Sequence, residues 1–97
     1  MFARVASFEG GDVDRLREIN EERMRAGTMN PPAGARSAMV LQDSENQRRL
    51  FITMFDSREE IAAAEQRFGA MGDEIPEEIR GRRTSVDVYE VVWSEDL

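Results

Sequence analysis

The chain has 97 residues and a net charge of −7, and it contains no histidine, cysteine or lysine, so that all 13 basic residues are arginine. These absences exclude imidazole or thiolate catalysis, a Schiff-base lysine, and metal or haem sites that need His or Cys ligands. The acidic balance argues against a nucleic-acid partner, and no stretch approaches the roughly 20 apolar residues of a membrane span, so we expect a cytoplasmic protein without membrane contact.

The length bounds the organisation of the chain. Residues 1–97 are enough for a single domain. A domain of this size hides only roughly 60–65% of the surface that its unfolded chain exposes. Pairing with a second copy would therefore be an easy way to gain a larger core.

The first third of the chain predicts a strand, a helix and a connector. Residues 2–8 mix β-branched and aromatic side chains and stop at a glycine pair, which indicates a strand. Asp12 suits the N-cap of a helix that reaches about Arg25, and Gly27 suits a left-handed stop. Residues 26–34 contain two prolines and other turn formers, so they predict an irregular connector.

The middle of the chain predicts a β-hairpin. Strands at about 35–42 and 48–55 flank the polar loop 43–47. The arginine pair that opens the second of these strands, Arg48 and Arg49, is interpreted as a solvated strand entry. The later pair at 82–83 is interpreted in the same way.

The last third predicts two helices and a strand. Ser57 with a glutamate three residues on forms a capping box, which opens a helix expected to end at Gly69 and Gly72. Pro76 suits the first turn of a short helix, and a strand covers about 83–93. The order β-α-β-β-α-β predicts an α+β, ferredoxin-like antiparallel sheet with two helices on one face.

Large apolar side chains occupy both faces of this predicted sheet. A sheet with one wet face alternates cleanly between apolar and polar residues, and these strands do not. The face without helices is expected to carry an aromatic set consisting of Phe51, Phe55, Tyr89 and Trp93. Such an exposed patch is rare on monomers, so we predict a homodimer with the two sheets packed face to face.

Short motifs form a familiar pattern over nearly the whole chain. They are Met-x-Ala-Arg-Val at the start, Phe8-Glu9-Gly10, Pro32-Ala33-Gly34, Ile52-Thr53-Met54-Phe55-Asp56-Ser57, and Val88-Tyr89-Glu90-Val91-Val92. The pattern resembles the antibiotic biosynthesis monooxygenase-like group of the dimeric α+β barrel superfamily. The resemblance implies a homodimer of ferredoxin-like subunits with a cavity for a small hydrophobic or aromatic molecule.

The resemblance also bears on the chemistry. Characterised relatives include cofactor-free quinone-forming oxygenases and haem-degrading oxygenases. Because this chain has no histidine, a proximal haem ligand cannot be carried over, and Phe55 stands where the group often has a tryptophan. No catalytic residue of the group transfers to a numbered position, and we predict no cofactor.

The first predicted helix holds two polar candidates for ligand binding. Asn20 and Arg23 fall within its inward stripe of Val13, Leu16, Ile19 and Met24. They would orient a substrate oxygen or an enolate from within the cavity. In the alternative, Arg23 lies at the helix edge beside Glu78 or the acidic connector, and Asn20 caps a loop carbonyl.

The first and last strands hold further candidates. Arg4 and Glu90 lie on strands that are antiparallel neighbours in this topology, so a cross-strand ion pair is natural. Alternatively, Glu90 is a catalytic carboxylate whose pKa is raised by burial, with Asp87 and Tyr89 as weaker candidates.

The sequence is therefore compatible with two functions. The chain is a dimer that binds a small hydrophobic or aromatic metabolite without catalysis, or it is a cofactor-independent monooxygenase for a hydroxylated aromatic or polyketide-like substrate. The aromatic set lines the ligand pocket in one interpretation and forms ordinary dimer core in the other.

Overall fold

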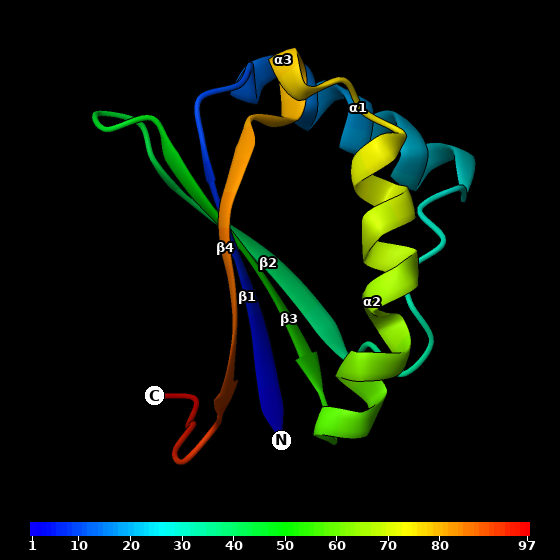
Figure 1. Cartoon of the computed structure of the whole chain (residues 1–97), viewed down its shortest axis with the longest axis vertical. Coiled ribbons are helices and arrows are strands. Elements are labelled where there is room, and N and C mark those ends of the chain that lie inside the picture. Colours follow the sequence, from blue (N-terminus) through cyan, green and yellow to red (C-terminus); the bar gives the residue numbers. More distant parts are fainter.

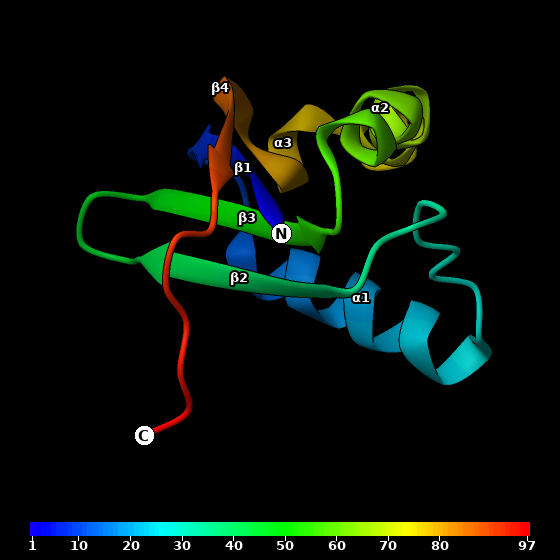
Figure 2. The same ribbon diagram turned by 90° about the horizontal axis from the view of Figure 1, so that it is seen from below.

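A computed structural model describes residues 1–97, and its strands form one antiparallel sheet. The strand order is β2-β3-β1-β4, and the helices lie on one side of the sheet (Figures 1 and 2). The predicted ferredoxin-like βαββαβ order is thereby confirmed. No helix is long and apolar enough to cross a membrane. The elements are β1 (Phe2–Glu9), α1 (Val13–Ala26), β2 (Ser37–Asp43), β3 (Arg48–Phe55), α2 (Arg58–Asp73), α3 (Glu77–Arg80) and β4 (Arg82–Glu90).

The helix starts follow the predicted caps. The Asp12 carboxylate accepts a hydrogen bond from the Arg15 N–H at 3.0 Å, and the Ser57 hydroxyl accepts one from the Glu60 N–H at 3.2 Å. Gly27 ends α1 in the left-handed conformation, with φ 70°. These local signals need no tertiary contact to act, which is why the sequence reveals them.

The helix α2 ends within one residue of the predicted Gly72, but not through a left-handed glycine. The helix continues through Gly69 and Gly72 to Asp73, and neither glycine has a positive φ. A glycine stops a helix readily when its backbone turns left-handed. Here the last turns are held against the core by the contacts of Phe68 and Met71, so the right-handed helix persists.

The last strand is shorter than predicted and ends at Glu90. Its partner β1 begins at Phe2, which pairs in register with Glu90. The final link is the Val91 N–H, which donates to the Met1 carbonyl at 2.9 Å. After Val91 the chain leaves on the side away from the helices (Figure 1).

The core lies between the sheet and α2. Its buried members are Phe55, Ile61, Ala64 and Phe68. The Phe68 ring packs edge-on against Phe51 and Phe55, at centroid distances of 6.4 and 6.1 Å. Phe51 and Phe55 therefore face the helices.

The expectation of one aromatic set on the open face was accordingly wrong. Residues that oppose each other in an antiparallel pair point to the same face. Tyr89 opposes Ala3, on the face opposite to Phe51, and is 56% exposed. Trp93 lies beyond the end of β4 and is 70% exposed. The alternation of side chains between the two faces of each strand could be inferred from the sequence. The pairing register that relates β3 to β4 through β1 could not.

The face without helices is nevertheless apolar. Met39, Leu41 and Tyr89 are exposed there, beside the partly exposed Leu50 and Ile52. The predicted uncovered apolar face is thus present, with a mostly aliphatic surface.

Candidate functional site: a cavity between the sheet and the helices

A half-open pocket of about 460 Å³, called the cavity below, lies beside the core between the helix-facing side of the sheet and the three helices. This volume falls within the range of small-molecule sites. Its apolar walls include Ala6, Phe8 and Phe51 on the sheet and Leu16 and Phe68 on the helices. The cavity could therefore enclose an apolar or aromatic body.

Arginines dominate the polar part of this wall. Five arginines line the cavity against two carboxylates, Asp73 and Glu77, although the whole chain carries −7. The local charge is thus opposite to that of the protein. The arginines are Arg4, Arg49, Arg80, Arg82 and Arg83.

Arg4, on β1, is buried and fully paired. It is 2% exposed, and its Nε and Nη2 donate to the two carboxylate oxygens of Glu65 on α2, at 2.8 and 3.2 Å. Its Cζ lies 3.8 Å from the centroid of the Phe68 ring, a cation–π contact. The expected pair between Arg4 and Glu90 was wrong, because Arg4 opposes Val88 and extends instead to the helix above it.

Arg49, on β3, is buried without a carboxylate partner. It is 7% exposed; its Nη2 donates to the Arg80 carbonyl at 2.7 Å, and its buried Nη1 has no hydrogen-bond partner. Its Cζ lies 4.7 Å from the centroid of the Phe8 ring. Burial lowers the pKa of the Arg49 guanidinium. An arginine still keeps its proton at neutral pH, so the site holds a buried, uncompensated cation.

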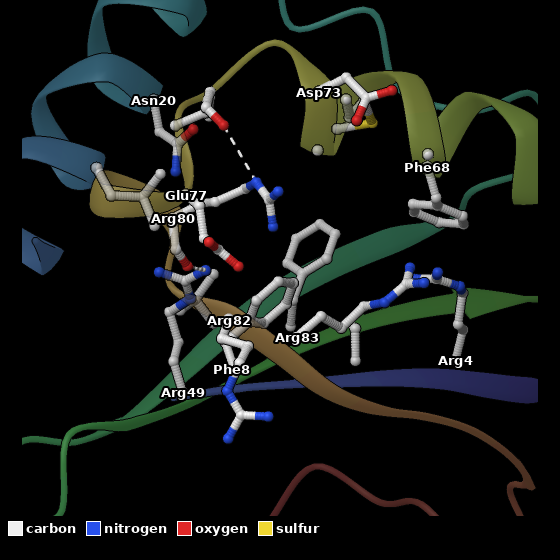
Figure 3. A pocket seen from close by; sticks show the side chains of 18 of the residues that line it. Arg4, Phe8, Asn20, Arg49, Phe68, Asp73, Glu77, Arg80, Arg82 and Arg83 are labelled. Atoms are coloured by element: carbon white, nitrogen blue, oxygen red, sulfur yellow. Dashed lines mark hydrogen bonds between the residues drawn. The ribbon is translucent and has the colours of Figure 1, made fainter. Parts of the chain in front are cut away.

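The other cavity arginines are occupied elsewhere or exposed. Arg80 donates to the carbonyls of Ile75 and Gly81, at 3.1 and 3.3 Å. Arg82 pairs with Glu9 at 3.0 Å, and Arg83 is exposed. Figure 3 shows Arg49 and Arg4 at opposite ends of the cavity.

Two close-packed glycines shape the turn that carries the Arg80 carbonyl. Gly11 and Gly81 have φ values of 89° and 82°, and a Cβ on Gly11 would lie 2.6 Å from the Ile79 carbonyl oxygen. Only glycine fits such an approach. The start of α1 and the end of α3 are thereby held together, above the Arg49 end of the cavity.

The predicted ligand-binding residues are divided by the fold. Asn20 and Phe51 line the cavity. Arg23 does not; it pairs with Glu74 at 3.2 Å, in agreement with the alternative that placed it beside the acidic connector. Phe55 is buried in the core behind the cavity, while Tyr89 and Trp93 lie outside it.

The candidate catalytic residues also lie outside the cavity. Asp87 opposes Val5 and shares the helix-free face with Tyr89. Glu90 is exposed at the end of β4 beside Phe2. The structure therefore brings none of the three candidates to the cavity wall.

Arg49 is the residue that sequence reasoning missed. Its interpretation as a solvated strand entry holds for Arg48, which is exposed, and is wrong for Arg49. The signal was the period of two residues in β3, which places Arg49 on the same face as Phe51 and Phe55. A charged residue that continues an aromatic face is a candidate for burial.

Comparisons with known proteins support the fold. No family model matches the sequence, and no curated protein matches it. Among solved structures, the chain is similar to a "putative antibiotic biosynthesis monooxygenase" from Deinococcus radiodurans, with a TM-score of 0.53 and 14% sequence identity. The match covers 100% of this chain and 98% of the other. The resemblance to the antibiotic biosynthesis monooxygenase-like group is thus confirmed at the level of the fold.

Proposed function

We propose that this protein binds a small molecule with an apolar or aromatic body in the cavity between the sheet and the helices. The observation that carries the proposal is the cavity itself, of about 460 Å³, with Phe8, Phe51 and Phe68 on its walls. Apolar walls with a few placed polar groups are typical of ligand sites.

The fold similarity favours a second candidate, a cofactor-independent monooxygenase acting on a hydroxylated aromatic substrate. That reaction needs a base beside the substrate, to form the electron-rich carbanion that reacts with O₂. The carboxylates of the cavity wall, Asp73 and Glu77, belong to exposed residues. Binding therefore remains the better-supported function. Oxygen uptake with a hydroquinone, abolished in Glu77→Gln, would reverse this preference.

The proposal includes a second copy of the chain on the helix-free face of the sheet. Met39, Leu41 and Tyr89 are exposed together there, and a small domain gains core by covering them. Sedimentation at micromolar concentration is expected to give the mass of a dimer. A monodisperse monomer would contradict this part of the proposal. It would not affect the proposal that the cavity binds a ligand.

The binding proposal can be tested by filling the cavity from the helix side. Gly72 lines the cavity, and a Cβ added there would meet no atom within 4 Å. We expect Gly72→Leu to weaken binding of the neutral fluorophore phenylnaphthylamine at least about tenfold, because the new side chain occupies its volume. Stability should be unchanged or raised, since a helical glycine is replaced.

Ala70→Leu is the matched control. Ala70 lies on the same helix, is exposed and does not line the cavity, so the same side chain there should leave binding unchanged. Equal fluorophore affinity in Gly72→Leu and the wild type would refute binding in this cavity. Failure of the wild type to bind phenylnaphthylamine would also refute binding in this cavity.

A further inference from the structure

Arg49 indicates which kind of ligand the cavity takes. We propose that the ligand carries one acidic group, a carboxylate or a sulfonate, which pairs with the Arg49 guanidinium while the apolar body lies along the aromatic wall. This inference rests on the proposed binding function and names its ligand class.

Arg49 lacks a partner of opposite charge. A buried charge is costly unless it is paired and hydrogen-bonded. Arg4, on the neighbouring strand, has both carboxylate oxygens of Glu65. Arg49 also lines the cavity, but its guanidinium has only one backbone carbonyl as acceptor, and its buried Nη1 has none. An acidic group on the ligand would supply the acceptor and the charge that the protein lacks.

Arg49 and Arg4 lie well apart along the sheet. Arg49 opposes Phe8 and Arg4 opposes Thr53, four residues apart on β3, which corresponds to about 13 Å along the strand. Phe51 and Phe68 lie on the wall of the cavity as well. Because Glu65 already neutralises the Arg4 end, a second acidic group would find no free cation there. The geometry therefore favours a ligand with a single charged end.

The cavity wall also carries two negative charges. Glu77 and Asp73 also line the cavity, and neither forms an ion pair with Arg49. Figure 3 shows the Glu77 side chain on the same side of the cavity as Arg49. Their negative charge opposes a multiply charged ligand and weakens the field of Arg49. Removing the charge of Glu77 should consequently strengthen binding of an anion.

Two fluorophores with the same aromatic body test the proposal. Anilinonaphthalene sulfonate carries one sulfonate, and phenylnaphthylamine is its neutral counterpart. Arg49→Gln should weaken binding of the sulfonate by about ten- to a hundredfold, which is the effect of a charge-assisted hydrogen bond, and leave the neutral compound unchanged. Arg49→Lys should restore part of the affinity for the sulfonate, since it keeps the charge.

Arg48→Gln is the matched control. Arg48 is the adjacent residue on β3 but is exposed and pairs with Asp43, so its loss should affect neither fluorophore. If Arg49→Gln weakens both fluorophores equally, Arg49 shapes the cavity rather than holding a charge, and the inference is overturned. Unchanged affinity for the sulfonate overturns it as well.

Glu77→Gln gives an independent test that does not touch Arg49. It should raise the affinity for the sulfonate and not for the neutral compound. No change in the sulfonate affinity would contradict the inference.

The two proposals fail in different ways. If Gly72→Leu leaves both fluorophores bound as in the wild type, the cavity is not the site and the proposed function fails. If Gly72→Leu abolishes binding but Arg49→Gln affects the two fluorophores equally, only the proposed ligand class is wrong.

Discussion

The two ends of the cavity contain the same kind of side chain in opposite situations. At one end Arg4 is 2% exposed and bound by both oxygens of Glu65. At the other end Arg49 is 7% exposed and has a single carbonyl acceptor. Both cations also contact an aromatic ring, Phe68 and Phe8 respectively. The difference between the two ends therefore lies in the carboxylate partner and not in burial or aromatic contact.

This comparison distinguishes a structural arginine from one that is available to a ligand. Arg4 joins β1 to α2, and Glu65 already supplies its acceptor. Arg49 joins β3 only to the last residue of α3, and its buried Nη1 has no acceptor. In an acidic chain with 20 carboxylate residues, a buried cation without a carboxylate is not explained by a shortage of partners.

The largest effect is expected where the paired end is broken. Glu65→Gln leaves Arg4 buried without its counter-charge, and removing one member of a buried pair is strongly destabilising. Because Glu65 itself is 45% exposed, water compensates part of the loss, and we expect the free energy of unfolding to fall by about 2 kcal/mol. Urea denaturation measures the change.

Glu59→Gln serves as the control for that variant. Glu59 is an exposed residue in the first turn of the same helix and forms no ion pair, so its substitution should change stability little. If the two variants are equally stable, the Arg4 end is not held by its ion pair, and the contrast between the two ends disappears.

A smaller effect of opposite sign is expected at the unpaired end. Arg49→Met replaces a buried, uncompensated cation by a shorter, flexible apolar side chain. Such replacements are neutral or stabilising, and we expect a gain between zero and about 1 kcal/mol in the free energy of unfolding. Thermal and urea denaturation measure it. A loss comparable with that of Glu65→Gln would mean that the bond from Arg49 to the Arg80 carbonyl is structural.

The smallest effect concerns an arginine that is paired but exposed. Arg48 and Asn46 donate hydrogen bonds to Asp43 in the hairpin, and these bonds, led by that of the Asn46 side chain, lower the pKa of Asp43 from 3.8 to about 2. A lowered pKa gives stability that is present above the unfolded value of 3.8 and is lost as the pH falls through about 2.

An NMR titration of the Asp43 carboxyl carbon should therefore give a midpoint near 2. The stability difference between the wild type and Asp43→Asn should be constant near neutral pH and vanish below that midpoint. A midpoint at the ordinary value for aspartate would show that the hairpin bonds do not persist in solution.

Much of the fold could be predicted because it depends on local signals. The Asp12 and Ser57 caps, the stop at Gly27 and the bounds of β3 follow from residues close in the sequence. The conformation of the glycines near the end of α2 could not, because Gly69 and Gly72 stay right-handed where Phe68 and Met71 pack in the core. The end of β4 depended likewise on where its partner β1 begins.

The candidate site was predictable only in part. Asn20 and Phe51 were named and do line the cavity. Arg49 was assigned to solvent together with Arg48, as an arginine pair at the start of a strand, because a sequence does not show which face of a strand the helices cover. The partner of Arg4 was missed for a related reason, since Glu65 lies 61 residues away on a helix.

The sequence by itself determined the order of elements, the excess of apolar surface over what two helices can cover, and the absence of every His-, Cys- or Lys-based chemistry. Composition and periodicity suffice for these, since they are properties of residue type and local spacing. Only the tertiary structure decided which arginine is paired and which is free. Register and helix placement bring residues distant in the chain within bonding distance, and no local pattern encodes that distance.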